Sequence, residues 1–163
     1  MLDAAKIFGD CGLMIDHFPH MDQALEQARM AESRGEVPIG AVLVGPDGQV
    51  LAADGNRILE LSDPTAHAEM QVIRQAAKKL GNERLDGCDL YVTLEPCAMC
   101  AQAIAFARIR RLYFGADDPK GGGVFYGARL YDQPTCHHRP EVYDGIKAAQ
   151  SSALLKEFFA QRR

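Results

Sequence analysis

The sequence predicts an α/β sandwich in which helices cover both faces of one mixed β-sheet. Segments whose apolar residues recur at helical spacing alternate with short β-branched and aromatic runs, in the order α-β-β-α-β-α-β-(β)-α. The chain has 163 residues, of which 47% are hydrophobic and 25% charged, so it can bury the core of one ordinary domain. We find no internal repeat, and we expect residues 21–163 to form one domain behind a poorly ordered extension, residues 1–20.

The first part of this pattern is a helix followed by a hairpin. Helical spacing predicts a helix over residues 21–31. The apolar run 39–45 and residues 49–56 are typical of two strands, and the sequence Pro-Asp-Gly at 46–48 supplies the turn between them.

A second helix is predicted over residues 67–81. Asp63 and Thr65 are good N-cap residues, Pro64 suits a helix entry, and Gly81 ends the apolar pattern. The carboxylate of Glu69 falls in the first turns, where the helix dipole favours a negative charge.

The rest of the chain alternates strand and helix. Pro96 suits the first turn of a helix, and residues 117–140 are rich in Gly, Pro and polar residues, which predicts long functional loops. The predicted elements are strand 88–95, helix 97–107, strand 108–116, short strand 140–146 and amphipathic helix 148–163.

The sequence Pro-Cys-Ala-Met-Cys places Cys97 and Cys100 three positions apart at a helix start. Residues i and i+3 share one helix face, so both sulfurs can reach one ion, and the helix dipole favours the thiolates that a metal needs. With His67 they form a ligand set that suits zinc and leaves the fourth tetrahedral position for water. Glu69, two positions after His67, points elsewhere and is predicted to move protons rather than bind the ion.

Three other interpretations of these residues stay open. Cys97 and Cys100 could form a redox dithiol. The site could be a closed structural zinc centre whose fourth ligand comes from Cys-His-His at 136–138. The third is a core histidine beside two buried cysteines.

The cysteine count and the charge distribution indicate the redox environment of the chain and the kind of partner it could contact. Five cysteines without an export signal argue against a disulfide framework and favour a reducing cytoplasm, and no apolar run approaches the ~20 residues that cross a membrane. The net charge is −4, but residues 98–163 carry +4 and residues 1–97 carry −8. The basic third is compatible with a local polyanion contact or with ordinary helix ends.

The pattern His-x-Glu followed by Pro-Cys-x-x-Cys is the established signature of zinc-dependent nucleobase deaminases. Around it, EVPIGAVLV, GNR, DPTAHAE, LYVTLEPCAMC, ARIRRLYFGADDPKGG, HHRPEV, DGI and LLKEFFAQRR resemble the family of bacterial tRNA-specific adenosine deaminases, in the cytidine/deoxycytidylate deaminase superfamily. The resemblance covers roughly residues 21–163, although residues 123–136 depart in detail from the best-known members. It implies a three-layer α/β/α sandwich with a five-stranded mixed sheet, of cytidine-deaminase type, usually assembled as a homodimer.

The resemblance also implies an activity and site residues. It implies deamination of adenosine to inosine at the wobble position of a tRNA anticodon, with one Zn²⁺ per subunit held by His67, Cys97 and Cys100. Glu69 would protonate N1 of adenine while water attacks C6, and would then carry a proton to the leaving ammonia. The residues implied to lie at the target nucleotide are Val37, Pro38, Asn56, Ala66, Pro96, Asp118 and Lys120.

Contacts to the anticodon stem-loop are expected in a loop and in the final helix. Leu154, Leu155 and Phe158 have core-facing spacing, so the more exposed side of that helix is left for RNA. The loop residues could touch phosphates, stack on bases, or simply form an exposed polar loop. The residues expected to contact RNA are His137, His138, Arg139, Phe159, Arg162 and Arg163.

Two alternatives differ in function. A small-molecule deaminase of the same superfamily, acting on guanine, cytosine or deoxycytidylate, would share the metal site. A noncatalytic, zinc-stabilised RNA-binding subunit is a different class, and the free carboxylate of Glu69 argues against it.

Overall fold

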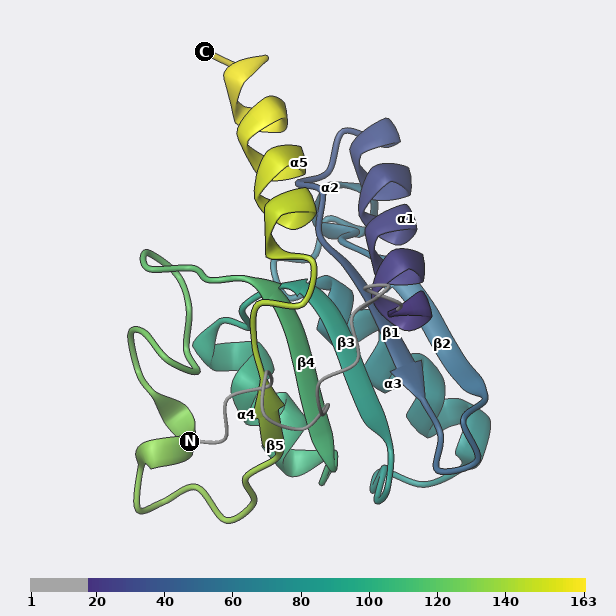
Figure 1. Ribbon diagram of the computed structural model, residues 1–163. Helices are drawn as coiled ribbons and strands as arrows, with labels where there is room; N and C mark the ends of the chain where they lie inside the picture. The colour runs from purple at the N-terminus through teal and green to yellow at the C-terminus, as the bar shows by residue number, and fades with distance from the viewer. Residues whose placement is uncertain (1–17) are drawn as a thin grey trace, which may run out of the picture.

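Figure 1 shows the computed structural model, which describes residues 18–163. Five strands form one mixed sheet in the spatial order β2-β1-β3-β4-β5. β1 pairs antiparallel with both β2 and β3, whereas β3, β4 and β5 run parallel, which confirms the predicted five-stranded mixed sheet. The strands are β1 (Gly40–Val44), β2 (Val50–Gly55), β3 (Asp89–Leu94), β4 (Arg111–Ala116) and β5 (Glu141–Tyr143).

Helices pack on both faces of this sheet. α1 and α5 cover one face, and α3 and α4 cover the other, so the predicted three-layer sandwich is confirmed (Figure 1). No helix in residues 18–163 is long and apolar enough to cross a membrane. The helices are α1 (Pro19–Ser33), α2 (Ile58–Leu61), α3 (Ala68–Leu80), α4 (Ala98–Phe106) and α5 (Ala148–Ala160), with the short 3₁₀ helix η2 (Leu130–Asp132) in the long loop after β4.

Residues 1–17 of the expected extension lie outside the described residues. The remaining three are part of the folded chain, because α1 begins at Pro19 and Phe18 packs against the core beneath it.

Alternating side chains in β1 serve both halves of the core. Ala41 and Leu43 pack in the cluster that contains Val72 of α3, whereas Val42 packs with Met21 of α1. Every residue of β1 is buried, as expected for a strand that helices cover on both faces.

Helix α1 approaches the sheet very closely at Gly40. A β-carbon at this position would lie 2.0 Å from the carbonyl oxygen of Ala24 and 2.5 Å from the amide nitrogen of Ala28. Only a residue without a side chain allows this contact.

The predicted N-cap residues of α3 are wrong, although the helix begins within one residue of its predicted start. The Asp63 carboxylate accepts hydrogen bonds from the backbone N–H and the hydroxyl of Thr65 within a local turn, and neither residue caps the helix. α3 begins at Ala68, whose N–H donates to the side-chain oxygen of Asn56 at 2.9 Å. A cap supplied by a residue outside the helix leaves no signal in the sequence next to it. The short helix α2, just after Asn56, was also not predicted.

Candidate metal centre and adjoining groove

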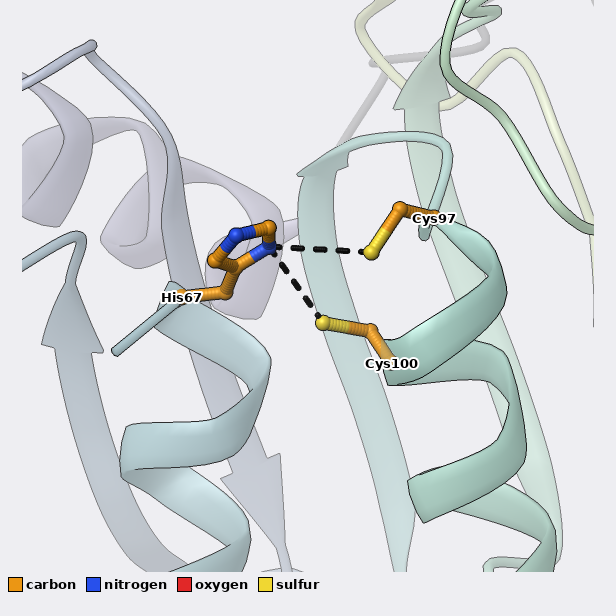
Figure 2. A group of neighbouring side chains, drawn as sticks. All are labelled: His67, Cys97 and Cys100. Carbon is orange, nitrogen blue, oxygen red and sulfur yellow. Dashed lines mark hydrogen bonds between the residues drawn. The ribbon is translucent and has the colours of Figure 1, made fainter. Parts of the chain in front are cut away.

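The amino ends of α3 and α4 meet beside the end of β3, and three side chains converge there (Figure 2). His67 is the N-cap residue of α3, Cys97 is the N-cap residue of α4, and Cys100 lies in the first turn of α4. The imidazole Nδ1 of His67 is 3.7 Å from Cys97 Sγ and 3.6 Å from Cys100 Sγ. Pro96 directly precedes the N-cap residue, two positions before the first residue of α4, rather than in the first turn as predicted.

These positions suit a tetrahedral zinc ion. With zinc–sulfur bonds of about 2.3 Å and zinc–nitrogen bonds of about 2.0 Å, a tetrahedral angle separates sulfur from nitrogen by roughly 3.6 Å. The three ligand atoms lie within 4.8 Å of one another, and no other group of His, Cys, Asp or Glu in residues 18–163 does so. The set is therefore a zinc site of His-Cys-Cys type with one open position.

Two of the residues that could offer a fourth ligand to a closed structural zinc centre are engaged elsewhere. The thiol of Cys136 donates to the carbonyl oxygen of His138 at 3.1 Å. The Nε2 atom of His138 is 2.6 Å from the carbonyl oxygen of Ile109, so this ring is engaged with backbone.

The pKa values of the two thiols shift in opposite directions. A hydrogen bond from Cys100 lowers the pKa of Cys97 to about 4, and the same bond raises the pKa of Cys100. Cys97 is therefore the thiol that more readily becomes a thiolate, the form in which cysteine binds a metal.

Glu69 is buried in the first turn of α3, with 4% of its surface exposed. Its carboxyl group lies outside the mutual ligand group of His67, Cys97 and Cys100. Burial raises the pKa of Glu69 to about 7. A carboxyl group with this pKa can both give and take a proton near neutral pH.

Three further predicted residues lie at this centre. Asn56 is 3% exposed and uses its side-chain oxygen on Ala68, which leaves the amide nitrogen as a hydrogen-bond donor. Ala66 and Pro96 are buried, and each directly precedes one of the ligands. Pro38 is buried as well.

A groove of about 970 Å³ lies beside the metal centre. Leu94 lines the groove, and the ligand Cys97 follows it by three residues, so the end of β3 joins the two features. The metal ligands and Glu69 are not part of the lining. The lining residues are Val37, Ile39, Leu94, Asp117, Asp118, Lys120, Leu155, Lys156, Phe159, Ala160, Arg162 and Arg163.

Six of the residues predicted from the sequence therefore line this one groove. Three were predicted to lie at the target nucleotide, namely Val37, Asp118 and Lys120. The other three were predicted to contact the anticodon stem-loop, namely Phe159, Arg162 and Arg163. Among them, Asp118 also forms a local turn, because its carboxylate accepts hydrogen bonds from the backbone N–H groups of Lys120 and Gly121. Both interpretations of this aspartate, as a turn former and as part of the site, are therefore compatible with its position.

Helix α5 supplies one wall of the groove. Phe158 is buried as predicted, but Leu155 lines the groove and was wrongly assigned to the core. Sequence reasoning also missed Lys156. The signal was available, since Lys156 lies three residues before the exposed Phe159 and therefore on the same helix face.

The loop residues His137, His138 and Arg139 do not reach this groove. They precede β5, which pairs with the beginning of the parallel strand β4, whereas the groove starts at Asp117, just after β4 ends. Their contact with RNA stays a prediction.

Comparison with known proteins agrees with this site. The family described as MafB19-like deaminase matches residues 15–163. The chain is 61% identical over 147 residues to the tRNA-specific adenosine deaminase of Agrobacterium fabrum, which is 90% of this chain and 95% of that protein. A solved structure from studies of A-to-I editing by tRNA wobble-position deaminases is similar with a TM-score of 0.82 and 62% identity, over 83% of this chain and 98% of that one. The guanine deaminase of Bacillus subtilis is also similar, with a TM-score of 0.60 and 33% identity, over 76% and 82% of the two chains.

Proposed function

We propose, because this chain belongs to the MafB19-like deaminase family, that it deaminates adenosine to inosine at the wobble position of a tRNA anticodon. The observation that carries the substrate class is the groove beside the zinc site. Lys120, Lys156, Arg162 and Arg163 line it together with the exposed ring of Phe159. Cationic side chains suit phosphates, and an exposed aromatic ring suits an unpaired base.

The residues of the centre divide the chemistry among them. Zinc held by His67, Cys97 and Cys100 would supply a water activated for attack on C6 of adenine. Glu69 protonates N1 of the base during attack, takes up the proton that the attacking water releases, and delivers it to the leaving amine, a task that suits a buried carboxyl group with a pKa of about 7. Asn56 orients the base through its amide nitrogen, since its oxygen is already bound to the helix start.

A small-molecule deaminase is the rival function. The chain shares its fold with a guanine deaminase, and the zinc site alone does not separate the two activities. The groove favours RNA, because a free base offers no phosphates to the basic side chains that line it.

This proposal includes an oligomeric state and a cellular location. We propose a homodimer, and the apolar surface of α2 supports it, since Leu59 is 67% and Leu61 is 52% exposed. A tRNA substrate implies work in the cytoplasm. Light scattering on the purified protein should give twice the chain mass, and a monomer at the concentration of the assay would contradict the dimer.

One incubation tests the substrate. The purified protein is mixed with an anticodon stem-loop that carries a wobble adenosine and, in parallel, with free adenosine, guanine and cytidine. Inosine and ammonia are then measured. We expect inosine from the stem-loop alone. Ammonia from free guanine or cytidine, with no inosine in the stem-loop, would overturn the proposal.

A further inference from the structure

A buried carboxylate that the zinc chemistry does not use lies between the metal centre and the groove. Glu95 follows the last residue of β3, precedes the ligand Cys97 by two positions, and is 2% exposed. Its backbone N–H continues the pairing with β4 by donating to the carbonyl oxygen of Ala116. Its side chain is therefore held at the junction from which both the metal centre and the groove extend.

The carboxylate of Glu95 accepts four backbone hydrogen bonds from one loop, residues 118–126, here called the anchored loop. One oxygen, Oε1, accepts from the consecutive N–H groups of Val124, Phe125 and Tyr126 at 3.1, 2.8 and 3.2 Å. The other, Oε2, accepts from the N–H of Asp118 at 3.0 Å. Consecutive N–H groups that converge on one point form an anion-binding nest, and here the anion is a side chain of the same chain.

The anchored loop is shaped to admit this contact. A β-carbon on Gly122 would lie 2.5 Å from Oε1 of Glu95, and one on Gly123 would lie 2.4 Å from the amide nitrogen of Ala98. The N–H of Gly123 also donates to the carbonyl oxygen of Pro96 at 2.8 Å. The loop therefore lies directly on the segment that carries Cys97, and its glycines permit the close approach.

The same loop carries two groove residues. Asp118 and Lys120 line the groove, and the N–H of Asp118 is the one that Oε2 of Glu95 holds. The carboxylate of Glu95, together with the hydrogen bond from Gly123 to Pro96, therefore holds these side chains relative to the zinc site.

We propose that Glu95 is a positioning residue for the RNA substrate, which it serves by fixing the anchored loop against the turn that bears Cys97. This inference rests on the proposed function only for the identity of the substrate. The anchoring itself is a property of the free protein.

The variant Glu95→Gln separates the hydrogen bonds made by Oε1 from the one made by Oε2. Its amide oxygen can replace Oε1 and keep the three N–H bonds, but its amide nitrogen then faces the N–H of Asp118, so that two donors oppose each other. Amide hydrogen exchange in the free protein should become about tenfold faster at Asp118, because one charge-assisted hydrogen bond is lost there. Exchange from Val124 to Tyr126 should stay unchanged. Glu95→Ala should quicken exchange at both places.

Kinetics with the stem-loop tests the functional part. We expect the KM of Glu95→Gln to rise about tenfold, while kcat and zinc content stay within about twofold of the unmodified protein, because the lost bond touches neither the ligands nor Glu69. Gly122→Ala should also raise KM, because its β-carbon would lie 2.5 Å from Oε1 of Glu95 and 2.6 Å from the carbonyl oxygen of Asp118, so the contact between the carboxylate and the anchored loop must shift.

Glu36→Gln is the matched control. Glu36 is also 2% exposed, and its Oε1 alone accepts the N–H groups of Leu59 and Glu60 at 2.8 and 2.9 Å, so the amide oxygen can replace it.

Unchanged exchange in both Glu95 variants, or loss of zinc with an unchanged KM, would overturn the inference. If the unmodified protein leaves the stem-loop untouched, the proposed function fails, while exchange in the free protein still decides whether Glu95 anchors the loop.

Discussion

The side-chain oxygen of Asn56 accepts a hydrogen bond from the backbone N–H of Ala68 at 2.9 Å. Ala68 follows the zinc ligand His67, so this contact fixes the start of α3 at the metal centre. One buried side chain thus has two tasks: its oxygen serves the fold, and its amide nitrogen is left for the substrate.

Substitution of Asn56 should separate these tasks. Asn56→Asp keeps an acceptor for Ala68 but loses the donor, so stability to urea should be retained while kcat/KM on the stem-loop falls by 10² or more, roughly the loss of one buried polar contact to the base. Asn56→Ala should in addition lower the free energy of unfolding by about 0.5–2 kcal/mol, the usual worth of a helix cap. Full activity of Asn56→Asp would argue against a contact between this amide and the base.

Glu69→Ala should keep zinc and lose turnover. The carboxyl group is not one of the metal ligands, so metal analysis should still find one zinc per chain. Loss of the proton carrier should lower kcat by about 10²–10⁴. His67→Ala is the contrasting variant, since it removes a ligand and should release the ion. A folded Glu69→Ala protein without zinc would show that the carboxylate binds the metal.

Two arginines at the end of α5 should respond differently to removal. The guanidinium of Arg162 lies 3.5 Å from the centre of the Phe158 ring and donates to the carbonyl oxygen of the same residue, so Arg162→Ala should cost about 0.5–1 kcal/mol of stability as well as RNA affinity. Arg163→Ala should leave the melting temperature unchanged and weaken RNA binding, with a salt dependence reduced by about one unit of slope. Equal RNA affinity of both variants and the unmodified protein would exclude a contact by this tail.

Two glycines should differ sharply in their tolerance of alanine. At Gly40 a β-carbon would lie 2.0 Å from a backbone oxygen of α1, so Gly40→Ala should destabilise the fold by more than about 3 kcal/mol. Gly81 ends α3 with a φ of +63° and has nothing near its missing β-carbon, so Gly81→Ala should cost only about 1 kcal/mol. Urea unfolding of the two variants measures both values, and similar losses would contradict the close packing of α1 on β1.

The zinc site and the order of the elements could be predicted from the sequence because both depend on short-range patterns. His67, Cys97 and Cys100 stand at helix starts that propensity and spacing reveal, and the continuous apolar run of β1 marks a strand buried on both faces. The cap of α3 could not be predicted, because it comes from Asn56, which lies outside the helix.

The groove shows the same limit. Leu155 has the spacing of a core residue, and only the position of α5 against the end of β3 turns it toward the groove. The triplet at 137–139 matches family positions, yet strand pairing places it beside the beginning of β4. Glu95 gave no signal because its role depends on the path of a loop that lies 23 to 31 residues later, and hydrophobic periodicity does not reveal the path of a loop.

The position of β3 also bears on how the chain folds. It pairs with β1, almost fifty residues earlier, and the helices that carry His67 and Cys97 lie on the layer built over these strands. Because this strand pairing is non-local and therefore slow, we expect the ligands to come together only after it is complete. Zinc should accordingly leave the folding rate almost unchanged and mainly lower the unfolding rate. The ion would then lengthen the lifetime of the folded state as well as supply chemistry.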